Sequence, residues 1–254
     1  MITIVCAKQV VDVSEIKIDP HTKKPILQGL SKKISDIDKN ALEEAIKIKE
    51  KNGGKIIVLC VGSPDAKERL KELLAMGADE AVLIPFEETF DYHMVAQLLA
   101  GAVKKLGSFD LILCGEASID LFSGQIGPRL AGILNIPQIT YAQKITTEKN
   151  KVTAERNMGE NIVITESSYP VVITVTKEIN TPRLPSLMQI LGSAQKPIHE
   201  WNPQSLLQEK PVLTTKVVEL SGISMHRKNI IFKDDLDQSV HKLVDCLIHE
   251  GVLR

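Results

Sequence analysis

The sequence predicts an α/β protein with a doubly wound, mostly parallel β-sheet. Short apolar runs recur along the first half of the chain, which is typical of strands buried on both faces. Stretches with helical periodicity separate these runs, and alternating strands and helices form right-handed crossovers in a parallel sheet. The chain has 254 residues, enough for one large domain with appendages or for two small domains.

The strands of this sheet are predicted from apolar runs that end at turn residues. The first run covers residues 2–7 and begins almost at the first residue. The second covers residues 55–61, and Gly62-Ser63-Pro64 follows it as a turn. Residues 81–84 and 110–114 repeat the pattern. Together these runs indicate four buried, neighbouring strands.

Four helices are predicted between and after these strands. Residues 39–51 and 64–76 place apolar side chains on one face and charged ones on the other. Residues 92–106 indicate a third helix, which Gly107 closes. The fourth covers residues 124–134.

From about residue 138 the pattern becomes that of β-structure. Residues 138–146, 151–157, 161–166 and 171–176 are β segments separated by turn residues. The last of them is a β-branched run, which favours a strand. We expect these segments to extend the sheet with antiparallel strands.

The C-terminal part is predicted to be an extended arm. Residues 180–221 are rich in Pro, Gln and Lys, and their prolines interrupt any continuous helix. Residues 235–250 form an amphipathic helix that docks either on this chain's own core or on another subunit. The expected division is an α/β nucleotide-binding domain at 1–180 and a recognition loop with an arm at 181–254.

Composition excludes several classes of partner. The net charge is −1, and 4% of residues are aromatic, which disfavours nucleic acid. Nothing approaches the roughly 20 apolar residues of a membrane span, so we expect no membrane insertion and a cytoplasmic protein. The four cysteines, Cys6, Cys60, Cys114 and Cys246, form no C-x-x-C pair; we expect buried, reduced thiols.

Chemistry is expected beyond the carboxyl ends of the strands, where open α/β sheets bind ligands. The richest segment is Cys114–Ala131, with small and hydroxyl residues before a helix. Such a loop aims backbone N–H groups at a phosphate, although the same residues also suit an ordinary turn and cap. The P-loop, G-x-G-x-x-G, H-E-x-x-H and G-x-S-x-G motifs are absent from the sequence. We therefore assign no catalytic and no metal-binding residue.

Six segments in order carry a more specific signal. They are Val5–Val10, Ser35–Ala45, Ala75–Asp79, Cys114–Ala131, Ile136–Gln138 and Lys177–Met188. With these segments the chain resembles the β subunit of electron-transfer flavoproteins over nearly its full length. The resemblance implies a fold of the adenine-nucleotide α-hydrolase-like type and an adenine nucleotide at the strand carboxyl ends.

The resemblance also implies which residues hold the nucleotide. Those expected around the adenosine are Cys6, Ala7, Ser35, Asp36, Ile37, Asp38, Val61 and Gly62. Those expected around the phosphates are Asp120, Leu121, Phe122, Ser123, Gly124, Gln125, Ile126, Gly127, Pro128, Arg129, Leu130 and Ala131. Within this loop, the Asp120 carboxylate is expected to hold the loop's shape or a sugar hydroxyl rather than a phosphate. The Ser35–Asp38 segment is expected to be a loop before a helix that starts at Lys39.

Partners follow from the same resemblance. Pro182–Ala194 resembles a recognition loop that touches a flavin-dependent dehydrogenase, with Leu184, Leu187 and Met188 in contact. Leu187 would be its anchor, since an exposed Leu in such a loop is a plausible hot spot; the alternative is that Leu187 folds under the loop. The arm would embrace the α subunit, which holds its own FAD.

The identity of the nucleotide is the open question. Members of the respiratory type hold structural AMP, and members of the flavin-bifurcating type hold a second FAD that accepts hydride from NADH. We favour FAD, with NADH as transient electron donor, because Asp36–Asn40 departs from the Asn-Pro-aromatic version of the respiratory type. AMP in a non-bifurcating carrier is the alternative.

Two readings come from other classes. ATP hydrolysis of the α-hydrolase type is disfavoured because the turn Lys8–Asp12 lacks an S-G-G-x-D-S loop. An ATP-binding signalling module of the universal-stress type leaves the long arm unexplained. The chain alone is not expected to be catalytic; in an electron carrier the flavin performs the chemistry.

Overall fold

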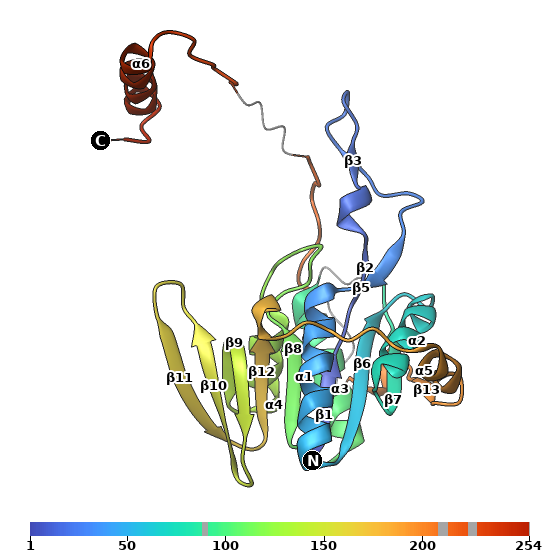
Figure 1. Ribbon diagram of the computed structural model, residues 1–254. Coiled ribbons are helices and arrows are strands. Elements are labelled where there is room, and N and C mark those ends of the chain that lie inside the picture. The colour runs from blue at the N-terminus through green and yellow to red at the C-terminus, as the bar shows by residue number, and fades with distance from the viewer. Residues whose placement is uncertain (88–90, 208–212, 223–227, 254) are drawn as a thin grey trace.

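A nine-stranded β-sheet forms the centre of the computed structural model, which describes residues 1–87, 91–207, 213–222 and 228–253 (Figure 1). In spatial order the strands are β11 (Ile162–Ser168), β10 (Lys151–Asn157), β9 (Gln138–Thr147), β12 (Val171–Val175), β8 (Leu111–Gly115), β1 (Ile2–Cys6), β6 (Lys55–Gly62), β7 (Glu80–Pro85) and β13 (Ile198–Glu200). The α/β class and the mostly parallel sheet are confirmed.

The directions of the strands differ in part from the prediction. In spatial order, the strands β9, β12, β8, β1, β6, β7 and β13 pair in parallel with their neighbours. β10 pairs antiparallel with both β9 and β11. The expected antiparallel extension is therefore confirmed for the β9–β10 and β10–β11 pairs and wrong for β12, both of whose pairs are parallel. β12 lies between β8 and β9 and all its residues are buried, the environment that a β-branched apolar run favours.

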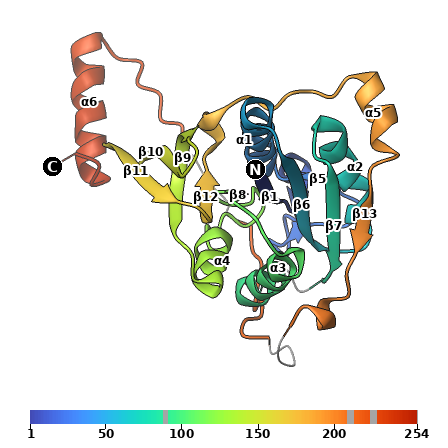
Figure 2. The ribbon, with the colours of Figure 1, turned by 90° about the horizontal axis from the view of Figure 1, so that it is seen from below.

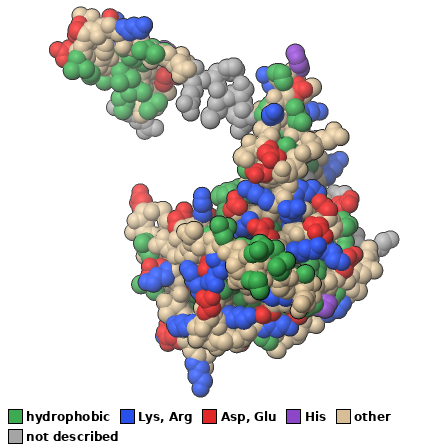
Figure 3. Space-filling model, turned by 45° about the vertical axis from the view of Figure 1, so that its right-hand side comes forward, with side chains coloured by type: hydrophobic (Ala, Val, Ile, Leu, Met, Phe, Trp, Pro, Cys, Tyr) green, Lys and Arg blue, Asp and Glu red, His purple; other side chains and the backbone are tan. Residues whose placement is uncertain are grey.

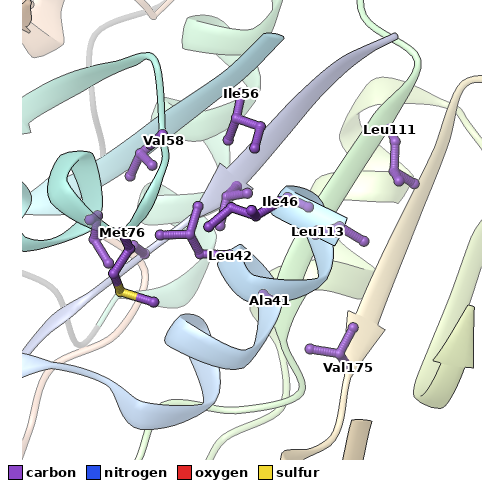
Figure 4. Packing of buried hydrophobic residues seen from close by; sticks show 14 of the residues in the cluster. Ala41, Leu42, Ile46, Ile56, Val58, Met76, Leu111, Leu113 and Val175 are labelled. Carbon is purple, nitrogen blue, oxygen red and sulfur yellow. The ribbon is translucent and has the colours of Figure 1, made fainter. Parts of the chain in front are cut away.

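Helices cover both faces of the sheet (Figure 2). α1 (Asp36–Asn52) and α2 (Ala66–Met76) pack on one face, where Leu42 and Ile46 meet strand residues such as Val58 (Figure 4). α3 (Tyr92–Leu106) and α4 (Ile126–Leu134) pack on the other, around a second apolar core. These are the four predicted helices, and α3 has the predicted bounds.

The strand order reverses at β1. The chain passes from β1 outwards to β6 and β7, and then crosses through α3 to β8 on the other side of β1. A crevice therefore opens between the carboxyl ends of β1 and β8, which is where doubly wound sheets bind ligands.

The segment after residue 180 returns to the core. α5 (Leu187–Ser193) packs against α2, and β13 extends the sheet beside β7, with Ile198 opposite Ala81. Leu206 is buried in the core under α3. The expectation that residues 180–221 form an arm outside the core is therefore wrong for the stretch of residues 187–206. Its strand of three residues is too short to produce a period-2 pattern.

The predicted C-terminal helix is present as α6 (Leu236–His249), away from the sheet (Figure 1). None of its residues is buried. Cys246 on this helix is half-buried, whereas Cys6, Cys60 and Cys114 are buried; all four are free thiols. In the described ranges, no helix combines the length and apolar character needed to cross a membrane.

Short elements that the sequence did not indicate rise from the carboxyl edge of the sheet (Figure 1). β2 (Gln9–Val11) pairs with β5 (Lys32–Ile34), and β3 (Lys17–Ile18) pairs with β4 (Pro25–Ile26). The described residues also form the 3-10 turns η1 (Val13–Glu15), η2 (Lys177–Ile179) and η3 (Pro203–Ser205).

At the lateral edge of the sheet opposite β13, β11 is an edge strand that, among the described strands, pairs with β10 alone. Its side chains Ile162 and Ile164 are 61% and 71% exposed. The outer part of the sheet thus presents apolar residues to solvent.

Candidate functional site

A pocket occupies the crevice at the strand-order reversal. Six segments line it: the ends of β1, β6 and β8, the first turn of α1, one face of α3, and the loop into α4. The lining residues are Cys6, Ala7, Lys8, Asp38, Val61, Tyr92, Val95, Leu99, Cys114, Gly115, Glu116, Ala117, Ser118, Ser123, Gly124, Gln125 and Ile126. We call this the first pocket.

Asp38 is the buried polar group at its floor. Its carboxylate accepts the Lys8 N–H at 2.9 Å and the Gly115 N–H at 3.2 Å, so it joins the ends of β1 and β8. Desolvation raises the pKa of Asp38 to about 7, against the lowering effect of these N–H bonds. A Cβ on Gly115 would lie 2.6 Å from Asp38 Oδ1, so only glycine fits here.

The Ser35–Asp38 segment differs from its expected form. α1 begins at Asp36, so Asp36, Ile37 and Asp38 form its first turn rather than a loop. Ser35 is the N-cap residue but its hydroxyl makes no capping bond. Side chains in a helical first turn are fixed in direction, and here Asp38 faces the pocket while Asp36 pairs with Lys33 at the surface.

Lys8, which lines the first pocket, forms an ion pair with Asp120. Lys8 Nζ lies 2.7 Å from Asp120 Oδ2, and the two side chains are 22% and 19% exposed. This pair holds the loop after β8 against the end of β1, the loop-holding role expected of Asp120. Among the described residues, the buried atom Asp120 Oδ1 has no hydrogen-bond partner; because Asp120 lines the second pocket, a ligand could satisfy this atom.

The loop into α4 presents backbone donors. Phe122 and Gly124 adopt positive φ angles of 47° and 65°, which bend the chain sharply before the helix. The N-cap residue Gln125 makes no side-chain cap, and its Oε1 accepts instead from Arg129 Nε at 2.9 Å. The first N–H groups of α4 are thus left without a side-chain acceptor, an arrangement suited to an anion.

A second pocket adjoins the first at the ion pair. Lys8 lines both pockets, and its ion-pair partner Asp120 lines the second. The remaining walls come from residues 9–32, the ends of β6 and β7, the loop after β8, and the C-terminal segment 213–222. The residues are Gln9, Val10, Val11, Ile16, Pro25, Leu27, Lys32, Gly62, Ser63, Glu87, Leu121 and Leu220. The second pocket is therefore largely apolar, with two lysines and two carboxylates at its borders.

The structure divides the predicted nucleotide residues into three groups. Those lining the first pocket are Cys6, Ala7, Asp38, Val61, Ser123, Gly124, Gln125 and Ile126. Those at the second pocket are Gly62, Asp120 and Leu121. Those lining neither are Ser35, Asp36, Ile37, Phe122, Gly127, Pro128, Arg129, Leu130 and Ala131. In the last group Leu130 and Ala131 are core residues of α4, and Phe122 is 66% exposed.

Sequence reasoning missed Lys8 and the α3 residues Tyr92, Val95 and Leu99 of the first pocket. Lys8 directly follows an apolar strand, which was a usable signal. The inward face of α3 gave none, because its apolar side chains look the same whether they line a pocket or a core.

The predicted partner-binding residues lie on the surface around α5. Leu184, Leu187 and Met188 are 92%, 71% and 77% exposed, so Leu187 does not fold under the loop. Figure 3, which brings this side of the molecule forward, shows hydrophobic side chains gathered in a patch. We call Leu184, Leu187, Met188, Ile190 and Leu191 the α5 patch; all five are exposed.

The fold places the chain among doubly wound α/β proteins, a class that binds ligands at the switch in strand order, and the first pocket lies at that position. Residues 26–206 match the electron transfer flavoprotein domain. The chain is 39% identical to the electron transfer flavoprotein subunit beta of Thermoanaerobacterium thermosaccharolyticum, and 40% identical to that of Megasphaera elsdenii. Each match covers 98% of this chain and 99% of the relative.

A third relative is subunit CarD of the caffeyl-CoA reductase-Etf complex of Acetobacterium woodii, 39% identical over 80% of this chain and 79% of the relative. The chain belongs to the electron transfer flavoprotein family, as one of its β subunits. The family match selects this reading over the hydrolase and stress-module readings.

Proposed function

We propose that this chain is the nucleotide-holding β subunit of a heterodimeric electron carrier, and that the nucleotide is FAD. The observation that carries the proposal is the pair of adjoining pockets at the strand-order reversal, which meet at Lys8. Family membership supports an electron-transfer role; the geometry supports the choice of ligand.

The first pocket fits an adenine nucleotide. The N-terminus of α4, which has no side-chain cap from Gln125, offers N–H groups to a phosphate. Asp120 Oδ1, beside Lys8 in the adjoining second pocket, suits a sugar hydroxyl. The apolar lining from Val61, Val95 and Leu99 suits a purine. The predicted contacts of Cys6, Ala7, Asp38 and Ser123–Ile126 with the nucleotide belong to this proposal.

The second pocket favours FAD over AMP. AMP would fill the first pocket alone, whereas FAD carries a further ring system on its second phosphate. The apolar side chains Val10, Val11 and Leu27 provide a surface for such a ring. The similarity to CarD, a subunit of a reductase-Etf complex, supports the bifurcating type with NADH as transient electron donor. AMP in a non-bifurcating carrier remains the second candidate.

A bound flavin would supply the one- and two-electron chemistry. The protein's own residues position it: Asp38 fixes the strand ends, and the Lys8–Asp120 pair sets the border between the pockets. We further propose that the α subunit binds α6, whose apolar face is unburied, and that a flavin-dependent dehydrogenase docks on the α5 patch.

The experiment is to co-express the chain with the α subunit, denature the purified heterodimer, and quantify the released nucleotides. We expect about two FAD and no AMP per heterodimer, given one FAD in the α subunit. One FAD and one AMP per heterodimer would mean that this chain holds AMP and not FAD. Release of neither nucleotide beyond the α subunit's FAD would overturn the assignment of the first pocket.

Two variants separate the pockets. Val11→Trp fills only the second pocket and should reduce retained FAD several-fold while AMP still binds. Ala117→Leu narrows the first pocket, where Ala117 is 8% exposed, and should weaken both nucleotides. If Val11→Trp reduced retained FAD and retained AMP by the same factor, the second pocket would not hold the ring of FAD.

A further inference from the structure

Asp91 is a buried carboxylate that the proposed ligand does not use. Asp91 is the N-cap residue of α3 and is 1% exposed. One oxygen, Oδ1, accepts the Met94 N–H at 2.9 Å and caps the helix. The other, Oδ2, accepts the backbone N–H groups of Thr214 and of Thr215, the latter at 3.1 Å. The Thr214 hydroxyl also lies 3.1 Å from Oδ2.

These bonds join elements 123 positions apart in sequence. Burying a carboxylate is costly unless its oxygens are paired, and the N–H bonds from Met94, Thr214 and Thr215 outweigh desolvation and lower the pKa of Asp91. Capping of α3 needs only Oδ1, so Oδ2 is left to bind the backbone of Thr214 and Thr215. Asp91 is thus an anchor for the described arm segment 213–222.

From Asp91 the segment runs to the second pocket. Leu220 lines that pocket. Gly222 donates its N–H to Lys23 O at 2.7 Å and packs on Ile18, where a Cβ would lie 2.6 Å from Ile18 Cδ1. The segment is therefore held at both ends, with Leu220 between Asp91 and the hairpin. The next residue after Asp91, Tyr92, lines the first pocket.

We propose that residues 213–222 are a wall of the second pocket that Asp91 holds in place, so that Asp91 is a positioning residue for the ring-bearing half of the ligand. The inference rests on the proposed function, since it names how the chain selects FAD over AMP. It also makes the ligand and the arm interdependent: a ligand that contacts Leu220 favours the anchored arm, and an anchored arm favours that ligand.

Asp91→Ser separates anchoring from capping. Serine is a good N-cap, so it keeps the bond to Met94, but it lacks the second oxygen that the arm requires. The full-length chain and this variant are titrated separately with FAD and with AMP. We expect the dissociation constant for FAD to rise about tenfold, within the usual range of such couplings, while that for AMP changes less than about twofold.

Two companion measurements check the cause. Hydrogen exchange at the Thr214 and Thr215 amides should accelerate in Asp91→Ser, because their acceptor is removed. Thr214→Val removes the hydroxyl contact but keeps both backbone bonds, so its FAD affinity should fall less than that of Asp91→Ser.

Three outcomes would overturn the inference. Unchanged FAD affinity in Asp91→Ser, with faster exchange of the two amides, would show that the arm is no wall for the ligand. A parallel loss of FAD and AMP would assign Asp91 a purely structural role. A wild-type chain that binds AMP and not FAD would overturn the choice of FAD, and this inference with it, and would be seen before any variant is made.

Discussion

Asp38 shows how a single residue fixes the candidate site before any ligand arrives. Its two oxygens bridge the N–H groups after β1 and at the end of β8. The strand ends are thereby held at the spacing that opens the crevice. The cost is a carboxyl group 7% exposed in apolar surroundings, and this cost depends on pH.

The pKa of Asp38 gives a prediction for stability. Its folded value of about 7 exceeds the ordinary 3.8, so between these values the folded state binds the additional proton. The free energy of unfolding should therefore fall as pH rises from 4 to 7, by up to about 1.4 kcal/mol per unit from this group, and level off above 7. Urea titrations of wild type and Asp38→Asn at pH 5 and 7 measure it. The wild-type advantage should shrink by roughly 2 kcal/mol; an equal pH dependence in both proteins would contradict the assignment.

Gly127 and Gly132 in α4 make a matched pair. A Cβ at Gly127 would lie 2.3 Å from Thr174 Cγ2, whereas one at Gly132 meets nothing within 4 Å. Gly127→Ala should destabilise the protein by about 1–3 kcal/mol through overpacking. Gly132→Ala should be neutral or stabilise by up to about 1 kcal/mol, because alanine is the better helix former. Thermal unfolding decides; similar effects of both changes would rule out the close contact of α4 with β12.

At the scale of elements, the strap at residues 177–183 fastens the segment before the α5 patch to α1. Arg183 Nε lies 2.9 Å from Glu43 Oε2, and Arg183 Nη1 lies 2.6 Å from Glu50 Oε1. Asn40 Nδ2 donates to Asn180 O at 2.7 Å, and Asn180 Nδ2 donates to Asn40 O at 3.0 Å. The segment directly before the α5 patch is therefore fixed to α1.

The two glutamates have different weights in this strap. Glu43 is 5% exposed and Glu50 is 57% exposed at the side chain. Arg183→Ala removes the charged partner of the buried Glu43, which keeps only the bond from the backbone N–H of residue 183 among its contacts with this residue, and should cost about 3 kcal/mol of unfolding free energy. Glu50→Gln removes only the exposed pair and should cost less than about 1 kcal/mol. Chemical denaturation measures the unfolding free energy of both variants. A loss in Glu50→Gln as large as that in Arg183→Ala would contradict this ranking.

The parallel sheet and its helices were predictable because buried strands and amphipathic helices leave periods in the sequence. β13 and the β2–β5 and β3–β4 hairpins were not, since strands of two or three residues carry no period. The start of α1 was misplaced because Asp36 and Asp38 are polar, and only tertiary contacts show Asp38 turned inward. In the candidate site, loops between predicted elements were found, whereas residues on helix faces, such as Tyr92, were not.

At the scale of the whole molecule, α6 is set apart from the α/β core. Its face of Leu236, Val240, Leu243, Val244 and Ile248 is exposed. Among the described residues, the hydrogen bonds of α6 stay within the C-terminal segment. A helix with one apolar stripe needs a surface to cover it. The α subunit of our proposal would provide that surface.

Deletion of residues 229–254 tests this separation. Because no α6 residue is buried, the unfolding free energy of the chain alone should change by less than about 0.5 kcal/mol. Binding to the α subunit should weaken by at least about tenfold, since helix-in-groove contacts rest on such apolar anchors. Isothermal titration and chemical denaturation provide the two readouts. A large loss of intrinsic stability would mean that α6 packs on the chain's own core.

The open edge at β11 has a consequence for how the protein must be made in the cell. A β-branched run with Ile162 and Ile164 exposed, next to unpaired backbone groups of an edge strand, is a template for adding a strand from another copy. A chain synthesised in excess of its partners would be the species exposed to such self-association. Balanced synthesis of the subunits would therefore protect this chain from aggregation as much as it would supply the carrier.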